Sequence, residues 1–575
     1  MRILLLTHAF NSLTQRLQAE LQGLGHELSI EFDIADSVAE EAVALFKPQL
    51  IVAPYLRRAI PESIWSQHVC LVVHPGIVGD RGPSALDWAL QGGETEWGVT
   101  VLQAEAEMDA GPIWASARFP LRAAKKASIY RNEVTQAATA AEIQAVERFA
   151  AGDFAPMPLA ACRDARGSVR PLMKQADRAI DWQRDNTATV LRKINAADGF
   201  PGVADTLFGT ACHLFDAWPE AALRGAPDAK AGALLARRET AVLRRTCDGA
   251  VWIGHARRAG DIKLPARLAF AAESAALPEA SLEDWWRVAG DTWQDIAYEE
   301  SDGVGLLHFE FYNGAMSTSQ CERLRGALSW AKQRPIRVLV LMGGADFWSN
   351  GIHLNVIEAA ASPADESWNN INAMNDLARE LIEAGGQITV AALAGNAGAG
   401  GCFLARAADL VWAREGVMLN PHYKNMGNLY GSEYWTYLLP RRLGEEGVGD
   451  KSRAIMRNRQ PLTARRAVET GFVDACLAGD TQAFRIDVVR RAAEIVAAAD
   501  LSARLGAKRE RRARDEAKKP LAAYREEELT HMRRNFYGFD PSYHVARHHF
   551  VRKSPASWTP RHLARHRELG WQVPA

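Results

Sequence analysis

Apolar and polar positions over the first 150 residues follow a repeating order that predicts a mostly parallel α/β sheet. Short apolar runs occupy residues 3–6, 50–55 and 70–74, with amphipathic stretches between them. Apolar runs of this length are typical of buried strands, and their alternation with amphipathic stretches indicates βαβ units. Polar residues follow the first run at once, so it is too short for a signal peptide and is predicted to be a buried strand.

The pattern changes twice farther along the chain. Short strands and turns predominate from about residue 160 to 275 and predict a small β-rich domain, whereas a second α/β region begins at residues 304–312. From about residue 480 the chain is predicted to be helical and densely charged, which we interpret as a solvated helix face. At roughly 100–200 residues per domain, 575 residues form several domains, which we predict to span 1–160, 161–275 and 285–575.

Charge and cysteine usage exclude several classes of protein. The chain has 68 Lys and Arg against 69 Asp and Glu, so no excess of charge favours a nucleic acid or a membrane surface. Its seven cysteines lack CxxC spacing, which is typical of reduced thiols and argues against a disulfide framework or a zinc site. No apolar run approaches the roughly 18 residues of a membrane span. We expect a soluble cytoplasmic protein without a metal, a nucleic-acid partner or a membrane partner.

A histidine stands where the apolar run of residues 70–74 meets a loop rich in glycine and proline. Open α/β sheets bind ligands outside the carboxyl ends of their strands, so His74 lies where a site is expected. Asp109 lies in a second glycine-containing turn between apolar runs. A carboxylate orients an imidazole and supports its charged form, so the two side chains suit proton transfer. On these residues alone, the alternative that His74 caps a strand and Asp109 caps a turn stays open.

The segment LVVHPGIVGDRGPSALDWAL (71–90), with EWGVTVLQAEAEMDAGPIWAS (96–116), resembles the formyltransferases that use 10-formyltetrahydrofolate. Segments such as MKQADRAIDW (173–182) and LRKINAADGFPG (191–202) resemble the C-terminal domain of methionyl-tRNA formyltransferases. The resemblance covers about residues 1–270. It implies a Rossmann-type α/β domain followed by a small β-rich, OB-like domain, and it implies that His74 and Asp109 surround the formyl group during transfer.

One position departs from the formyltransferase pattern. The family asparagine that holds the developing oxyanion corresponds to Val72, and the loss of such a donor costs on the order of 3 kcal/mol. Either another donor serves, or the acceptor is easier to formylate than an amine. Gln15 in FNSLTQR and Arg131 in SIYRNEVTQ are candidates to contact the folate, although a plain surface role for Arg131 stays open.

Two glycine-rich segments, ADFWSNGIHLNVIEAA (345–360) and GNAGAGGCFLARAADLVWA (395–413), resemble the crotonase superfamily of enoyl-CoA hydratases and isomerases. Glycine is suited to such loops because a side chain would keep a substrate carbonyl away from the backbone N–H groups. The resemblance implies a crotonase-like α/β domain whose oxyanion hole consists of the Ile352 and Gly400 amides. Glycines that serve only tight turns are the alternative.

The hydratase glutamates of the crotonase pattern correspond here to Phe403 and His422, so water addition is not expected. Tyr423 and Glu433 lie on the segment that faces the acyl group in this superfamily. A glutamate desolvated among aromatic residues would have its pKa raised towards neutrality and could exchange protons at pH 7. In the alternative, Glu433 is an exposed helix start and Tyr423 is core. The asparagines of WNNINAMNDL (368–377) either line the same pocket or cap helices.

A formyl-handling site and a CoA-thioester site on one chain point to formyl-CoA as a shared intermediate. A thiol is a stronger nucleophile at pH 7 than most hydroxyls, which agrees with the valine at position 72. A formyl thioester has no α-carbon, so it can lose its formyl proton and expel thiolate to release carbon monoxide. Glu433 and Tyr423 are suitable residue types to assist that step.

The whole chain, including the tail segment RRNFYGFDPSYHVARHHFVRKSP (533–555), resembles the HypX/HoxX family of hydrogenase maturation factors. The resemblance implies an enzyme that supplies the CO ligand of nickel–iron hydrogenase from 10-formyltetrahydrofolate through a bound coenzyme A whose pantetheine arm reaches both sites. It also implies hydrogenase maturation proteins or the hydrogenase large subunit as partners. Arg547 and Arg552 are candidates to contact folate or phosphate. The alternatives are an amine formyltransferase fused to a separate acyl-CoA enzyme, and a non-catalytic one-carbon scaffold.

Overall fold

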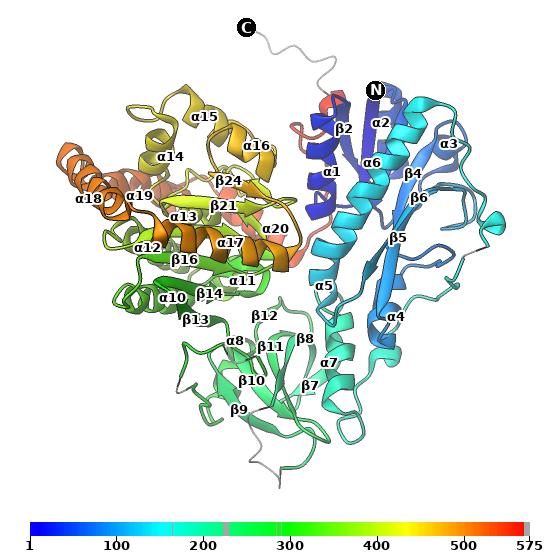
Figure 1. The fold of residues 1–575 in the computed structure, drawn as a ribbon. Coiled ribbons are helices and arrows are strands. Elements are labelled where there is room, and N and C mark those ends of the chain that lie inside the picture. Colours follow the sequence, from blue (N-terminus) through cyan, green and yellow to red (C-terminus); the bar gives the residue numbers. More distant parts are fainter. Residues whose placement is uncertain (164, 222–228, 283, 289, 568–575) are drawn as a thin grey trace. The chain divides into compact units, whose positions relative to one another are not determined.

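The computed structural model describes residues 1–163, 165–221, 229–282, 284–288 and 290–567, and Figure 1 labels many of its elements. The chain divides into two compact units. The first unit comprises residues 1–261 and 265–278 together with the segment that begins at Pro555, and the second comprises residues 262–264 and 279–554. The chain therefore runs from the first unit into the second and returns to the first at its C-terminal end.

The N-terminal part of the first unit is a six-stranded sheet in the order β2-β1-β3-β4-β5-β6. The strands from β2 to β4 are parallel, and β5 and β6 are antiparallel to their neighbours. Its strands are β1 (Arg2–Thr7), β2 (Glu27–Phe32), β3 (Leu50–Tyr55), β4 (Cys70–His74), β5 (Glu96–Gln103) and β6 (Ile113–Pro120). Its helices are α1 (Ser12–Gly23), α2 (Asp36–Phe46), α3 (Glu62–Trp65), α4 (Ala85–Gly92), α5 (Lys126–Ile129) and α6 (Thr135–Ala151). The apolar runs predicted to be buried strands form β1, β3 and β4.

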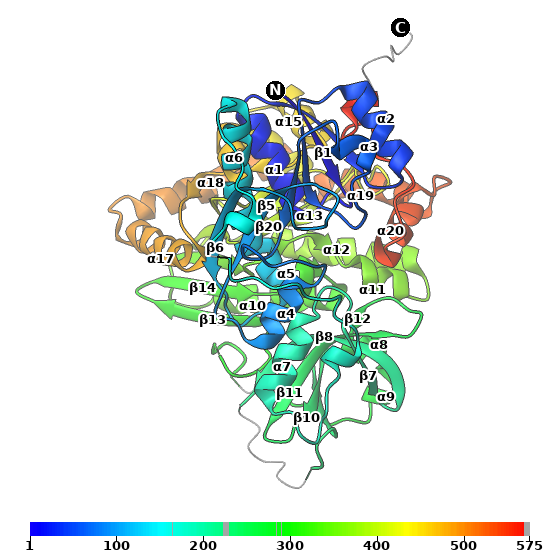
Figure 2. The same ribbon diagram turned by 90° about the vertical axis from the view of Figure 1, so that its right-hand side faces the viewer.

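An antiparallel sheet in the order β7-β8-β11-β10-β9 follows, and helix α7 packs against β8. Figure 2 shows this sheet from a second side. Its elements are α7 (Thr187–Ala196), β7 (Val203–Leu207), β8 (Thr210–Glu220), β9 (Leu234–Arg238), β10 (Ala241–Arg245), β11 (Ala250–Arg258), β12 (Leu264–Pro265), α8 (Ala266–Ala269) and α9 (Ala271–Ser274). The β-rich middle region predicted from the sequence is thereby confirmed.

The C-terminal tail packs on β2, the edge strand of the first sheet. The backbone N–H of Ile30 donates to the carbonyl of Leu563 at 3.0 Å. The fully buried His566 lies 2.7 Å from Ser29 Oγ through Nδ1 and 3.0 Å from Glu31 Oε2 through Nε2. The tail therefore covers backbone groups that an edge strand would otherwise present to solvent.

The second unit contains a six-stranded sheet in the order β13-β14-β16-β19-β21-β24, in which only the β13–β14 pair is antiparallel. Its strands are β13 (Ile296–Ser301), β14 (Val304–Phe309), β16 (Val338–Gly343), β19 (Ile388–Leu393), β21 (Leu410–Arg414) and β24 (Ala475–Leu477). Smaller sheets pair β15 (Ala315–Met316) with β18 (Gly351–Ile352), and join β17 (Phe347–Ser349), β20 (Asn396–Gly398), β22 (Met418–Asn420) and β23 (Leu462–Thr463). The loops that carry the candidate site residues leave these smaller sheets.

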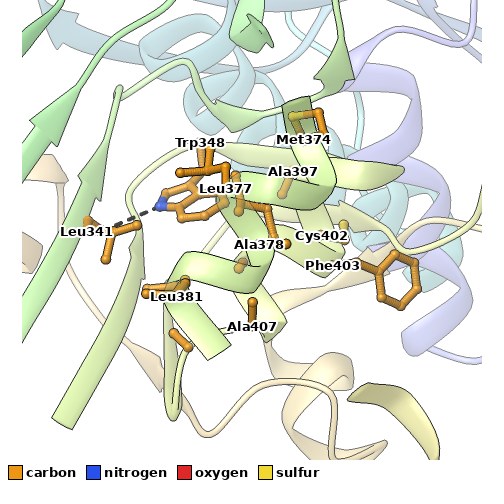
Figure 3. Packing of buried hydrophobic residues seen from close by; sticks show 14 of the residues in the cluster. Leu341, Trp348, Met374, Leu377, Ala378, Leu381, Ala397, Cys402, Phe403 and Ala407 are labelled. Carbon is orange, nitrogen blue, oxygen red and sulfur yellow. Dashed lines mark hydrogen bonds between the residues drawn. The ribbon is translucent and has the colours of Figure 1, made fainter. Parts of the chain in front are cut away.

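Helices surround the sheets of the second unit. They are α10 (Thr318–Ala331), α11 (Leu354–Ala359), α12 (Pro363–Ile382), α13 (Gly400–Arg406), α14 (Trp435–Leu443), α15 (Asp450–Arg457), α16 (Ala464–Glu469), α17 (Thr481–Ala497), α18 (Leu501–Lys518), α19 (Leu521–Tyr537) and α20 (Ser542–Arg552). Figure 3 shows Met374 and Leu377 of α12 packed in the same cluster as Trp348 and as Phe403 of α13. Helix α12 is therefore fixed in the core, with its buried polar residues held in place by the same packing.

Candidate functional sites

His74 ends β4, and its imidazole is almost fully buried. Its Nδ1 lies 3.6 Å from Asp109 Oδ2, so the structure brings the two predicted residues together, while its Nε2 lies 3.2 Å from Asp80 Oδ1. Asp109 has a left-handed backbone (φ 55°) and accepts the N–H of Gly82 at 3.1 Å. The imidazole therefore has a carboxylate beside each ring nitrogen, an arrangement that fixes the orientation of the ring for proton transfer.

Sequence reasoning missed Asp80, whose side chain is fully buried. Arg170 approaches it from the linker after the first sheet, with Nε 3.3 Å from Asp80 Oδ2. The backbone of Arg81 bonds to Ser168 and to Arg170, which holds the linker against the loop. A Cβ on Gly76 would lie 2.3 Å from His74 Nε2, so glycine is required for the close contact. Asp80 follows His74 by six residues in the sequence, whereas Arg170 follows His74 by 96. The positive charge that lies beside Asp80 is therefore apparent only in the fold.

The other residues predicted for the folate side lie on separate elements. Gln15 is on α1, where its Nε2 donates to the Phe10 carbonyl at 2.9 Å, and Arg131 lies on a π-helical turn before α6. Val72 is part of β4 and packs against an apolar cluster, so its side chain offers no donor. The contact of Gln15 and Arg131 with folate stays a prediction.

Arg547 and Arg552, the predicted tail contacts, lie on α20 of the second unit. Arg547 is nearly buried and donates through Nε to Glu358 Oε2 at 2.8 Å, and Arg552 Nε lies 3.8 Å from Glu358 Oε1. His548 also bonds to this carboxylate, at 2.7 Å. Glu358 therefore compensates much of their positive charge, and their predicted contact with folate or phosphate stays a prediction.

The second candidate site centres on Glu433, which is 1% exposed. The Tyr423 hydroxyl lies 2.5 Å from Glu433 Oε2, and the ring of Phe403 stacks on Tyr423 with centroids 5.6 Å apart. Burial raises the pKa of Glu433 to about 7, against the opposing effect of the Tyr423 hydrogen bond, and burial raises the pKa of Tyr423 well above its usual value. The carboxyl is therefore able to accept and return a proton near neutral pH.

The two glycine-rich loops meet beside this carboxyl. A Cβ on Gly351 would lie 3.3 Å from Gly400 N, and one on Gly400 would lie 2.4 Å from Glu433 Oε1. Ile352 directly follows Gly351, so the structure brings all four predicted residues of this site into one neighbourhood. Glu433 Oε1 has no hydrogen-bond partner within the described part of the chain. An unpaired carboxylate oxygen against a glycine Cα is the arrangement expected of a base that faces a substrate.

Two asparagines of residues 368–377, Asn370 and Asn375, bond to the backbone of the site loops. Asn370 accepts the N–H of His353 at 2.9 Å through Oδ1, next to Ile352, and Asn375 accepts the N–H of Glu433 at 2.8 Å. Both asparagines are fully buried. Both lie inside helix α12 and not at its cap, so they do not cap a helix, and a place at the wall of a pocket stays a prediction.

Within the described ranges, no cluster of three or more His, Cys, Asp or Glu side chains is arranged to hold a metal ion. In the same part of the chain, no helix is long and apolar enough to cross a membrane. All seven cysteines are free thiols.

Family profiles match three successive parts of the chain. The formyl transferase profile matches residues 29–146, the formyl transferase C-terminal domain matches 172–273, and the enoyl-CoA hydratase/isomerase profile matches 300–561. The hydrogenase maturation factor HoxX of Bradyrhizobium diazoefficiens is 54% identical to this chain over 569 residues, which is 99% of this chain and 97% of that protein. The chain belongs to the HypX/HoxX family of hydrogenase maturation factors. Its formyltransferase and crotonase domains support enzymatic activity.

Solved structures agree with this family assignment. HypX from Aquifex aeolicus, in complex with tetrahydrofolic acid, is 47% identical, has a TM-score of 0.94 and covers 100% of both chains. The methionyl-tRNA formyltransferase of Paraburkholderia phymatum is 26% identical over 237 residues, which is 40% of this chain and 70% of that protein. The HypX/HoxX likeness therefore extends over the whole chain, whereas the formyltransferase likeness is confined to its N-terminal half.

Proposed function

We propose that this chain produces carbon monoxide for the iron of a nickel–iron hydrogenase. It transfers the formyl group of 10-formyltetrahydrofolate to the thiol of coenzyme A and then releases CO from formyl-CoA. Its family supports the role in hydrogenase maturation, and the Aquifex relative solved with tetrahydrofolic acid supports a folate donor. The observation that carries the second step is the desolvated Glu433 carboxyl in contact with Gly400.

In the first reaction, a carbon–sulfur bond to the formyl carbon forms and the carbon–nitrogen bond to folate breaks. The thiol proton ends on the folate nitrogen, so the atoms balance without an oxidant. His74 moves this proton, and the carboxylates of Asp80 and Asp109 beside its ring nitrogens support that role. Val72 supplies no donor to the oxyanion, and a thiol acceptor needs less assistance than an amine.

In the second reaction, Glu433 takes the formyl proton while the carbon–sulfur bond breaks. The proton then passes to the departing sulfur, so formyl-CoA yields CO and a free thiol with no net gain or loss of protons. The Ile352 and Gly400 amides stabilise negative charge on the carbonyl oxygen. Tyr423, bonded to Glu433 Oε2, orients the carboxyl and assists the return of the proton to sulfur.

The test is to incubate the full chain with 10-formyltetrahydrofolate and coenzyme A and to trap CO with reduced haemoglobin. CO that depends on both compounds supports the proposal. A stable formylated amine without CO would indicate an amine formyltransferase, and no turnover would indicate a one-carbon scaffold. Mass spectrometry of the purified protein shows whether coenzyme A stays bound to it.

A further inference from the structure

The segment that carries Glu433 has an unusual backbone. Glu433 and Tyr434 follow each other in the left-handed region, with φ values of 57° and 60°, immediately before helix α14 begins at Trp435. This region is unfavourable for residues that have a Cβ, so two of them in succession persist only where surrounding contacts hold them. The contacts that hold this segment therefore determine where the Glu433 carboxyl lies.

Asn375 holds the segment from helix α12. Its Oδ1 accepts the N–H of Glu433 at 2.8 Å and the hydroxyl of Ser432 at 2.9 Å. Its Nδ2 is buried and has no hydrogen-bond partner among the residues that the structure describes. A buried amide that leaves its own donors unpaired destabilises the fold, and an apolar residue would avoid that cost. Asparagine at position 375 therefore supplies an acceptor to the Glu433 segment at a cost in the stability of the core.

Glu528 holds the same segment from helix α19. Its Oε2 accepts the N–H of Tyr434 at 2.9 Å, and its Oε1 accepts the N–H of Thr436 at 2.8 Å. These N–H groups lie at the start of α14, where backbone donors have no partner within the helix and need an acceptor oxygen. Burial raises the pKa of Glu528 to about 8, although the hydrogen bonds from Thr436 oppose this rise. Glu528 also accepts the hydroxyls of Thr436 at 2.6 Å and of Ser432 at 3.3 Å, so every hydrogen-bond partner of this buried carboxyl among the described residues lies in residues 432–436.

The position of the Glu433 carboxyl leaves little tolerance. Oε2 is 2.5 Å from the Tyr423 hydroxyl, and Oε1 lies where a Cβ on Gly400 would be only 2.4 Å away. A rotation of the peptide before Glu433 would move the carboxyl away from the Gly400 amide. Misplacement of a reacting group by about 1 Å can lower a rate by about 100-fold.

We propose that Asn375 and Glu528 are positioning residues of the acyl site, which hold residues 432–436 from two helices and so direct the Glu433 carboxyl to Gly400. This inference rests on the proposed function, because it assigns to Glu433 the proton transfer of CO release. Both helices are anchored in the core, α12 by side chains such as Met374 and α19 by side chains such as Met532.

The test measures CO release from supplied formyl-CoA, which bypasses formyl transfer. Asn375→Leu removes the acceptor but keeps a side chain that branches at Cγ, and we expect kcat to fall by about 10- to 100-fold while KM changes by less than about 3-fold. Asn375→Asp keeps an acceptor oxygen and should recover most of that loss. Glu528→Gln keeps one of two acceptor oxygens and should lower kcat by about 10-fold, which provides a second variant if Asn375→Leu does not fold.

The matched control is Ser367→Ala. Ser367 is also fully buried on α12, but its hydroxyl bonds to Tyr543 Oη at 2.8 Å and not to the Glu433 segment. We expect this variant to lose thermal stability but to keep kcat within about 2-fold of the unmodified chain. A kcat for Asn375→Leu no lower than that of Ser367→Ala would overturn the inference.

A crystal structure of Asn375→Leu separates this inference from the proposed function. We expect its Glu433 carboxyl to leave Gly400 and the left-handed pair at 433–434 to relax. If the unmodified chain releases no CO from formyl-CoA, the proposed function fails, and the crystal structure alone then decides the positioning role. A carboxyl that still lies against Gly400 in the variant would refute that role.

Discussion

The two candidate sites prepare a group for proton transfer in opposite ways. His74 has a carboxylate beside each ring nitrogen, and Arg170 compensates one of them. Glu433 is buried beside the phenol of Tyr423 and against Gly400, and burial raises its pKa to about 7. An imidazole changes its protonation near neutral pH without help, whereas a carboxyl does so only when it is desolvated. Charged neighbours are therefore suited to proton transfer by His74, and exclusion of solvent is suited to proton transfer by Glu433.

The largest expected effect is that of Glu433→Gln. Glutamine keeps the shape of the side chain but cannot take a proton, so CO release should fall by about 1,000-fold or more. Formyl transfer should continue, so formyl-CoA should accumulate and be measurable by mass spectrometry. Unchanged CO release would show that the site around Glu433 does not carry out the second reaction.

His74→Ala should lower formyl transfer by about 100- to 1,000-fold, because the transfer loses its proton carrier. Formyl-CoA should not accumulate in this variant, and CO release from supplied formyl-CoA should keep its normal rate. Equal accumulation of formyl-CoA in His74→Ala and Glu433→Gln would refute the assignment of separate reactions to the two sites.

CO release from supplied formyl-CoA should depend on pH through Glu433. The carboxyl must be ionised to take the formyl proton, and its pKa is about 7, so kcat should fall by about 10-fold for each pH unit below 6 and level off above 8. A pH profile of kcat checks this. A rate that stays constant between pH 5 and pH 7 would exclude Glu433 as the base.

Asp80→Asn should lower formyl transfer by about 10-fold, since an amide orients the imidazole less well than a carboxylate does. The release of CO from supplied formyl-CoA serves as the internal control and should not change. A loss as large as that of His74→Ala would mean that Asp80 has a direct part in the reaction, and no loss would leave orientation to Asp109 alone.

The smallest expected effect on either reaction comes from the tail, where His566→Ala should lower only stability. The hydrogen bonds from His566, Thr559 and Arg567 offset burial and lower the pKa of Glu31, so they stabilise the fold when Glu31 is ionised. We expect a loss of about 2–3 kcal/mol in the free energy of unfolding at pH 7, which shrinks as the pH falls below about 4.5. Thermal unfolding of the variant and of the unmodified chain, at pH 7 and at a pH below about 4.5, measures this loss. A change in kcat would show that the tail also acts on a site.

Much of the fold follows from local pattern. The apolar runs at residues 3–6, 50–55 and 70–74 became β1, β3 and β4, because a strand buried on both faces needs continuous apolar residues. Strand β2, ELSIEF, was not predicted, since charged residues interrupt it. Its Glu31 is buried only because the tail supplies His566 and Arg567 more than 500 residues later.

The residues of the candidate sites also fall into two groups, those that the sequence indicated and those that only the fold revealed. Residue type and position at a strand end pointed to His74 with Asp109, and the resemblance to the crotonase superfamily pointed to Glu433 with Tyr423. Asp80 and Glu528 gave no such signal, and Asn375 was noted only as one of the asparagines of residues 368–377. Each of these side chains acts through a partner from another element, such as Arg170 for Asp80 or the start of α14 for Glu528.

The amino-acid sequence by itself determined the order of domains and the residue types available at each site, because these depend on near neighbours in the chain. The tertiary structure alone decided which carboxylates flank His74, how far Glu433 is shielded from solvent and which helices contact its segment. Desolvation and hydrogen-bond geometry depend on groups that are close in space, and the chain brings such groups together only when it folds.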